Sequence, residues 1–485
     1  MLLEEILTKI TKNQNNVAYT VGENQYTYKE FYKYVCNIYR VLLIKNSSKR
    51  PVIVYGSKEI FMKATFLACS FAGMAYVPID IGMTENRINS IIEQVKPELI
   101  IGNLKSNIKN ISKNEIEKIM NEENYIDINK IYLQPDDIFY IIFTSGSTGL
   151  PKGVKVTYRN LESCIEWLKY ITKIEKGVIL NQASFSFDLS VADLYLSLVS
   201  GSNHYILEKQ EQLNFKLLFE KLNKSKATLA VMTPSFADLL LLDKSFNENL
   251  LPNLKTILFC GEKLLKTAVS KLYERFKNLE IINSYGPTEC TFAVTSIALT
   301  KKILNENNIP IGIPKKDVEI YIVDDKLNKL KDGKVGEILI VGQSVADGYI
   351  GESKNSFIKY NGKNAYLTGD LGYKKEKMIY YQCRKDNQIK YKGYRIELAD
   401  IESNLLHLNY IEKAVVIPKI SESGKVTKII AFVKLKENIE KKELEIRKEL
   451  LNKIPEYMCP TIKIIDKFPL NKNGKCDTKK LIEGV

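Results

Sequence analysis

The sequence predicts an α/β fold with several compact units, and both the length and the hydrophobic pattern of the chain indicate it. The chain has 485 residues, which at about 150 residues per domain corresponds to roughly three units. Short apolar runs rich in Ile, Val and Phe alternate with amphipathic stretches, as is typical of strands buried on both faces of a sheet. The clearest runs are Val52–Tyr55, Phe139–Phe143, Thr228–Met232, Thr256–Phe259 and Glu280–Ile282.

Other spacings predict the remaining elements of the N-terminal region. The N-terminus has apolar positions at helical spacing and early acidic residues, so we expect a helix there and no signal peptide. Apolar residues between Asn160 and Ile171 recur at steps of three and four, which predicts a helix. Alternation in Val318–Val323 and Glu337–Val341 predicts a more antiparallel, half-buried β region.

The order of elements changes after Asp386, which predicts a separate domain. Its expected elements are a helix Ala399–Leu408, strands Ala414–Ile417 and Lys428–Leu435, and a helix Lys441–Leu451. Helices and strands in this order are typical of a small α+β domain. We therefore expect an N-terminal domain over residues 1–385 and a C-terminal domain over 386–485, with the polar stretch Arg384–Asn387 as the hinge.

Composition excludes several classes of protein. With 45% hydrophobic residues, 14 Pro and 25 Gly, the chain is neither disordered, collagen-like nor a disulfide scaffold. Its eight cysteines form no CxxC pair, so we expect free thiols in the cytoplasm. Only His204 and His407 are present, which excludes a histidine metal cluster and argues against a Ser-His-Asp hydrolase. No apolar stretch approaches the about 18 residues of a membrane span.

The net charge of +14 leaves three kinds of partner open: nucleic acid, an anionic membrane or an acidic protein. A nucleic-acid-binding protein would need basic stripes interleaved with aromatic residues, or a recognisable binding module. The sequence contains neither, so we expect no nucleic-acid partner.

The sharpest local feature is a loop that follows the run Phe139–Phe143 directly. Thr144–Val154 reads TSGSTGLPKGV, with glycines, hydroxyl residues and Lys152 close together. Glycine lets backbone N–H groups turn toward an anion, hydroxyls add hydrogen bonds and lysine adds a charge, so the loop suits a polyphosphate. It does not match GxxxxGK[ST], because Lys152 lacks the required preceding glycine, and this disfavours a P-loop kinase or GTPase.

The loop resembles the signature of the adenylate-forming (acyl/aminoacyl-AMP) superfamily, which includes the adenylation domains of peptide synthetases. Eight companion motifs occur in the family's order: Tyr26–Phe31, Ala72–Asp80, Phe187–Ser190, Asn283–Glu289, Gly336–Gly342, Tyr366–Asp370, Gln388–Leu398 and Pro469–Lys475. The resemblance implies a large N-terminal domain of stacked α/β subdomains plus a distorted β region, with a small mobile α+β C-terminal domain.

Four strings resemble one branch of the superfamily, the D-alanyl carrier protein ligases. They are Ser184–Tyr195, Met232–Asp238, Leu258–Glu262 and Asn283–Thr288. This resemblance implies ATP-dependent activation of D-alanine, with Mg²⁺, and transfer to the phosphopantetheine thiol of an acidic carrier protein for teichoic acid D-alanylation. Three alternatives stay open. The first is a standalone adenylation enzyme that loads glycine, a small L-amino acid or another amino acid onto a carrier protein in a secondary-metabolite pathway. The others are an acyl- or aryl-CoA ligase and a catalytically inactive adenylate-binding regulator.

The resemblance also implies a nucleotide site. The residues that it assigns to ATP are Thr144, Ser145, Gly146, Ser147, Thr148, Gly149, Lys152, Asn283, Ser284, Tyr285, Gly286, Pro287, Thr288, Asp370, Tyr381, Arg384 and Lys475. The loop would hold the β- and γ-phosphates, Thr288 the α-phosphate, and Asp370 with Arg384 the ribose. Glu289 would hold Mg²⁺, a hard cation that prefers carboxylate oxygen.

For the acyl group, the family pattern implies a pocket formed by Asp188, Leu189, Val231, Met232, Leu258, Cys260, Ser284, Phe292 and Lys475. A buried Asp188 carboxylate would pair with an α-ammonium, which favours an amino acid over a fatty or aryl acid. Phe292 stands where the family usually has a small aliphatic residue, so we expect a reshaped pocket. Lys475 would be the catalytic lysine, and the C-terminal domain would rotate about Asp386 between two half-reactions.

Overall fold

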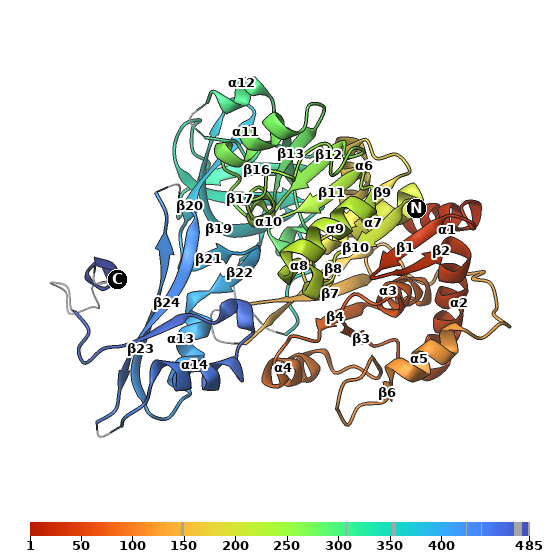
Figure 1. The fold of residues 1–485 in the computed structure, drawn as a ribbon, viewed down its shortest axis with the longest axis horizontal. Coiled ribbons are helices and arrows are strands. Elements are labelled where there is room, and N and C mark those ends of the chain that lie inside the picture. Colours follow the sequence, from red (N-terminus) through yellow and green to blue (C-terminus); the bar gives the residue numbers. More distant parts are fainter. Residues whose placement is uncertain are drawn as a thin grey trace. The chain divides into compact units, whose positions relative to one another are not determined.

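The computed structural model describes residues 1–146, 150–306, 308–351, 356–422, 424–437, 439–469 and 478–483 (Figure 1). The chain forms two compact units. The first contains Met1–Ile81, Gln94–Phe143 and Gly153–Lys385, and the second contains Gly82–Glu93, Thr144–Lys152 and Asp386–Val485. The last boundary falls between Lys385 and Asp386, and two segments from the N-terminal half are grouped with the C-terminal residues.

The first unit contains a nine-stranded sheet. Its strands, in spatial order, are β15 (Ile313–Pro314), β14 (Thr295–Ala298), β13 (Glu280–Tyr285), β12 (Thr256–Phe259), β11 (Leu229–Met232), β9 (Val178–Asn181), β10 (Asn203–Ile206), β1 (Val17–Val21) and β2 (Asn24–Thr27). The strands from β13 to β1 pair in parallel, and β14 and β2 pair antiparallel beside them. The carboxyl ends of the parallel strands therefore lie at one edge.

A six-stranded sheet forms the second layer of this unit, with β8 completing its edge. Its order is β6 (Asn110–Ile111), β5 (Ile100–Ile101), β3 (Val52–Gly56), β4 (Tyr76–Asp80), β7 (Ile138–Thr144) and β8 (Lys152–Thr157). The apolar runs predicted as buried strands correspond to β3, β7, β11, β12 and β13, so those predictions are confirmed.

Helices cover these sheets (Figure 1). Buried side chains of both sheets and of several helices share one hydrophobic core. The helices of the first unit are α1 (Leu2–Lys12), α2 (Tyr28–Lys45), α3 (Ile60–Ala72), α5 (Lys113–Met120), α6 (Tyr158–Thr172), α7 (Leu189–Ser200), α8 (Lys209–Leu213), α9 (Phe215–Ser225), α10 (Pro234–Leu240), α11 (Lys266–Arg275) and α12 (Lys301–Leu304). Helices α3 and α7 are buried along almost their whole length. Such all-round burial is what a helix inside a core requires.

Helix α6 shows how local sequence sets an element. Thr157 caps it, because its hydroxyl accepts the N–H of Asn160 at 3.2 Å while its own N–H is bound by the Asn160 side chain at 2.9 Å. Leu161, Cys164, Ile165 and Leu168 form the buried stripe that the spacing predicts. The helix predicted between residues 160 and 171 is therefore confirmed.

The antiparallel β region predicted before residue 350 is a five-stranded sheet. Its strands are β16 (Val318–Val323), β17 (Gly336–Gly342), β18 (Phe357–Tyr360), β19 (Lys363–Lys375) and β20 (Met378–Arg384). Alternate side chains of β16 and β17 pack with Tyr285 and Cys290 in a separate small core.

The second unit is an α+β domain with its own core. Its elements are α4 (Glu85–Val95, of which the last two residues belong to the first unit), β21 (Gln388–Tyr391), β22 (Tyr394–Glu397), α13 (Leu398–Leu406), β23 (Ile411–Ile420), β24 (Val426–Leu435), α14 (Glu443–Leu451), β25 (Thr461–Ile464) and α15 (Thr478–Glu483). Strands β23, β24 and β25 form one sheet and β21 pairs with β22. In the described ranges, no helix has both the length and the hydropathy for a membrane crossing.

The buried stripe of α6 provides a test of the core. Leu168→Ala removes a fully buried side chain and should cost about 2–5 kcal/mol, because it leaves a cavity between the helix and the sheets. The midpoint of thermal unfolding measures this loss. Leu242→Ala is the matched control, since Leu242 is 77% exposed; equal shifts for the two variants would contradict the assigned core.

Candidate functional site

Several predicted acyl-pocket residues lie at or near the ends of β11, β12 and β13, which are parallel strands of the nine-stranded sheet. Asn181, Val231 and Leu258 are register partners on β9, β11 and β12, and Ile282 continues the row on β13. Ligand sites of open α/β sheets lie beyond the carboxyl ends of the strands. The register therefore brings Val231 and Leu258 together at the edge where a site is expected.

Five of the predicted pocket residues share one hydrophobic cluster: Leu189, Val231, Leu258, Cys260 and Phe292. Met232 does not join them, because it belongs to the second core with its register partner Phe259. Successive side chains of a strand point to opposite faces. The structure therefore places the Met232 side chain on the face opposite that of Val231.

Asp188 stands at the start of α7 and is 7% exposed. Its side chain makes no capping hydrogen bond to the helix. A carboxylate beside a helix N-terminus is favoured by the helix dipole, whereas burial of a carboxylate is costly unless a cation or a hydrogen-bond donor compensates. The position suits a group that meets a positively charged ligand.

The loop that carries Phe292 is held in an uncommon backbone conformation. Thr291 and Phe292 have φ values of 59° and 70°, and both side chains are buried. A left-handed bulky residue is strained and persists where its surroundings fix it. Gly286 allows the close approach, because a Cβ there would lie 2.5 Å from Cα of Ala293. The Cys260 thiol lies 3.9 Å from the Phe292 carbonyl, and the side chain is buried.

The predicted nucleotide residues of the first unit form a buried hydrogen-bonded group. Tyr285 donates its hydroxyl to Asp370 Oδ2 at 2.6 Å, and Arg384 Nη1 binds Asp370 Oδ1 at 2.8 Å. Burial, followed by the charge of Asp370, raises the pKa of Tyr285 well above its ordinary value, so the phenol stays a donor. Tyr381 lies on β20, three residues before Arg384.

Asn283 and Ser284 end β13 beside this group. The Asn283 amide donates to the Pro310 carbonyl at 2.9 Å, and Ser284 Oγ donates to the Phe259 carbonyl at 2.8 Å. Both side chains therefore fix the strand end, and the loop with Gly286 and Pro287 follows it. Asn283, Ser284, Tyr285 and Asp370 form one continuous patch of predicted residues through β13 and its hydrogen bonds.

Glu289 is the predicted magnesium ligand. It lies with Thr288 in a short 3-10 turn, η1 (Thr288–Cys290), and both side chains are buried. The Tyr349 hydroxyl donates to Glu289 Oε1 at 2.6 Å. Within the described ranges, no cluster of three or more His, Cys, Asp or Glu side chains could hold a metal. A single carboxylate still fits Mg²⁺, which is commonly bound by one or two carboxylates plus the phosphates of a nucleotide.

The phosphate loop is described in part, within the second unit. Ser145 Oγ donates to the Arg395 carbonyl at 2.9 Å and accepts the Glu397 N–H at 3.3 Å, so it binds strand β22. Only glycine fits at 146, because a Cβ would lie 2.0 Å from the Leu150 carbonyl oxygen. Thr144 ends β7 and Lys152 begins β8. Ser147, Thr148, Gly149 and the predicted catalytic Lys475 lie outside the described residues.

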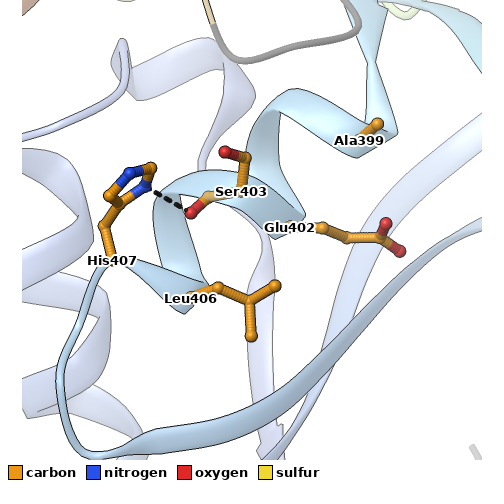
Figure 2. Close-up of a pocket in the computed structure, with 5 residues that line it drawn as sticks. All are labelled: Ala399, Glu402, Ser403, Leu406 and His407. Atoms are coloured by element: carbon orange, nitrogen blue, oxygen red, sulfur yellow. Dashed lines mark hydrogen bonds between the residues drawn. The ribbon is translucent and has the colours of Figure 1, made fainter.

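Asp386, the predicted hinge, is the first residue of the C-terminal stretch in the second unit. Its carboxylate accepts the N–H of Gln388 at 3.1 Å. Figure 2 shows a pocket elsewhere in this unit, lined by Ala399, Glu402, Ser403, Leu406 and His407 of α13 and the residue after it. None of these is a predicted site residue.

Sequence reasoning missed a polar group beneath the acyl pocket. Asn181, Asp193 and His204 are fully buried and hydrogen-bonded, and the amines of Lys58 and Lys63 are buried nearby. The available signal was Asp193, a charged residue inside an otherwise apolar helical stretch. Arg87 and Asp400 form a second missed pair, buried in the second unit with an N–O distance of 3.4 Å.

The chain is similar to known proteins over most of its length. Residues 7–350 match the family described as AMP-binding enzyme, and residues 400–475 match the AMP-binding enzyme C-terminal domain. The D-alanine--D-alanyl carrier protein ligase of Bacillus licheniformis is 39% identical, with 100% of both chains covered. The Lactococcus lactis protein of that name is 38% identical, covering 99% of this chain and 98% of its own.

Solved structures support the fold. The adenylation domain AlmE of Vibrio cholerae, in complex with glycyl-adenosine-5'-phosphate, has a TM-score of 0.84 at 22% identity. The similarity covers 100% of this chain and 97% of AlmE. This chain and AlmE therefore share the same fold.

Arg384→Met tests the buried ion pair. Asp370 is 3% exposed and would lose its cation, so the variant should lose about 3–5 kcal/mol of stability. Thermal unfolding is the measurement. Lys434→Met, which breaks the exposed pair with Glu412, should cost at most about 1 kcal/mol. The double variant Arg384→Met with Asp370→Asn removes the unpaired carboxylate as well. If this variant is no more stable than Arg384→Met alone, the loss of stability does not come from an unpaired carboxylate.

Proposed function

Because the chain belongs to the AMP-binding enzyme family, we propose that it activates D-alanine with ATP and transfers the D-alanyl group to the phosphopantetheine thiol of a carrier protein. The observation that carries the proposal is identity of 39% over the full length of a protein named for that reaction. The buried Asp188 carboxylate supports it independently, because a fatty or aryl acid has no ammonium for it to meet.

In the first step, a carboxylate oxygen of D-alanine attacks the α-phosphorus of ATP. The new P–O bond forms as the bond to the leaving oxygen breaks, which gives D-alanyl-AMP and pyrophosphate. The enzyme must hold the groups in line and offset the negative charge. We assign the loop from Thr144 to Lys152 to the leaving phosphates, Thr288 to the α-phosphate and Lys475 to the reacting oxygens.

ATP is the nucleotide of this proposal and Mg²⁺ its metal. Glu289 would hold the metal together with nucleotide phosphates, and the ion would offset phosphate charge. Asp370 would accept hydrogen bonds from the ribose diol, since the two oxygens of a carboxylate offer about four acceptor sites and Tyr285 and Arg384 use one on each oxygen. Arg384 and Tyr285 already fix that carboxylate through both oxygens, so it is preorganised for the ribose.

Asp188 would bind the α-ammonium of the amino acid. Leu189, Val231, Leu258 and Cys260 would surround Cα and the methyl group, and Cys260 would act as a wall that selects the configuration. Phe292 adds a large buried side chain to the same cluster, which favours a small substrate. That observation also favours the second candidate function, the loading of glycine or a small L-amino acid.

In the second step, the phosphopantetheine sulfur attacks the acyl carbon, a thioester forms and AMP leaves. We propose that the residues after Asp386 move between the two steps, so that Lys475 serves the first alone. A small acidic carrier protein fits the charge of +14, because opposite charge speeds encounter. We place the reaction in the cytoplasm, at the start of teichoic acid D-alanylation.

The amino-acid substrate distinguishes the two candidate functions. Exchange of pyrophosphate into ATP should be fastest with D-alanine, well above L-alanine and glycine, because the pocket selects size and configuration. Measured kcat/KM values over a panel of amino acids test this. Faster exchange with glycine or an L-amino acid would replace D-alanine by the second candidate.

Lys475→Ala tests the catalytic lysine. The variant should lose at least about a hundredfold in pyrophosphate exchange, since a charge that stabilises the transition state is removed. Binding of ATP, measured by calorimetry, should change little. Lys472→Ala, three residues earlier, is the control and should keep its activity; the assignment fails if both variants exchange at the parent rate.

A further inference from the structure

From the buried polar group beneath the acyl pocket, we infer that Asp193 is a positioning residue that sets the place of Asp188 against the amino-acid ammonium. The inference rests on the proposed function, because it concerns the substrate that Asp188 binds. It goes beyond that function by giving a role to a side chain outside the pocket.

Asp193 fixes helix α7 to the sheet. The Asn181 amide donates to both of its carboxylate oxygens, at 3.0 and 3.1 Å, and His204 Nε2 lies 2.9 Å from Oδ1. Asn181 ends β9 and His204 lies on the neighbouring strand β10. One carboxylate on α7 therefore binds side chains from two strands at once.

The hydrogen-bonded group adjoins the predicted acyl pocket. Asn181 is the register partner of Val231, and Val231 is the partner of Leu258. Asp188 precedes Asp193 by five residues, which is about 7.5 Å of helix rise. Little more than one helical turn separates the two residues, so a displacement of Asp193 relative to Asn181 would also displace Asp188.

The protonation states agree with a fixed anchor. Burial, together with Lys63 and Lys58, lowers the pKa of His204, so the ring is neutral. Its Nε2 is hydrogen-bonded to Asp193, and its buried Nδ1 has no hydrogen-bond partner within the described residues. On balance the pKa of Asp193 is raised well above its ordinary value, chiefly by burial, although the bond from Asn181 and the two lysines act in the opposite direction. Whichever of the two groups holds the proton, the hydrogen bond between Asp193 and His204 stays in place.

Other buried bonds hold the later part of α7. The hydroxyls of Tyr76 and Tyr195 are 2.9 Å apart, Lys63 Nζ donates to Ser197 Oγ at 3.1 Å, and the Tyr28 hydroxyl donates to the Ser197 carbonyl at 3.0 Å. Asp193 is the nearest of these anchors to Asp188. Loss of Asp193 should therefore loosen the first turns while the rest of the helix stays held.

Asp193→Asn tests this role, because it keeps the size of the side chain and replaces one oxygen that accepts a hydrogen bond from Asn181 with a nitrogen that donates. The variant turns an amide toward the Asn181 amide, so the two donors conflict. We expect the KM for D-alanine in pyrophosphate exchange to rise by about ten- to a hundredfold, as for Asp188→Asn, while the KM for ATP stays within about twofold. Asp136→Asn is the matched control, since its carboxylate is 83% exposed.

The exchanged pair Asn181→Asp with Asp193→Asn provides the rescue. Asn at 193 can donate to Asp at 181 and still accept from His204, so the KM for D-alanine should return to near the parent value. An unchanged KM in Asp193→Asn would overturn the inference. A second result would also overturn the inference. In that case Asp193→Asn raises the KM for D-alanine and the KM for ATP equally, and the exchanged pair restores the unfolding temperature but not the KM for D-alanine.

Hydrogen exchange measured by mass spectrometry separates this inference from the proposed function. Asp193→Asn should speed amide exchange in the first turns of α7 more than in its last turn. If the parent enzyme turns over no amino acid, the proposed function fails, and exchange in α7 still decides whether Asp193 anchors the helix. Unchanged exchange there would refute the anchoring itself.

Discussion

The cost of keeping carboxylates inside an apolar interior is the constraint on which the candidate site depends. Asp188, Asp193 and Asp370 are all buried in the first unit. An ionised side chain in such a place needs a cation or several hydrogen-bond donors. Asp370 has Arg384 and Tyr285, and Asp193 has Asn181, His204 and the field of two lysines. In the proposed function, the α-ammonium of the substrate would add a cation beside Asp188.

This constraint explains why the polar residues of the first unit lie where they do. Asp193 and Asp370 each connect elements that are distant in sequence, Asp193 through β9 and β10 and Asp370 through β13 and β20. A buried charge that loses its partner is far more costly than a surface one. The same bonds that satisfy these groups therefore fix the strand ends around the pocket.

Much of the fold could be predicted because local patterns determine it. The stripe of α6, its Thr157 cap and the apolar runs of β7, β11 and β12 are consequences of short-range spacing. The site could be predicted only through motifs. The role of Asn181 and His204 could not be predicted, because it depends on a contact that both side chains make, from two different strands, with the carboxylate of Asp193. Met232 was assigned to the pocket by motif, although strand alternation turns its side chain to the other core.

The predicted phosphate loop, residues 144–152, forms hydrogen bonds with residues that are distant in the sequence. Ser145 was predicted as a phosphate ligand, and its hydroxyl has one proton. In the second unit that proton is donated to the Arg395 carbonyl, and the oxygen accepts the Glu397 N–H. If Ser145 donates that proton to a phosphate oxygen, this oxygen would replace the Arg395 carbonyl as the acceptor. Hydrogen bonds to charged acceptors are roughly twice as strong as neutral ones, so a bound polyphosphate would favour release of β22 from the loop.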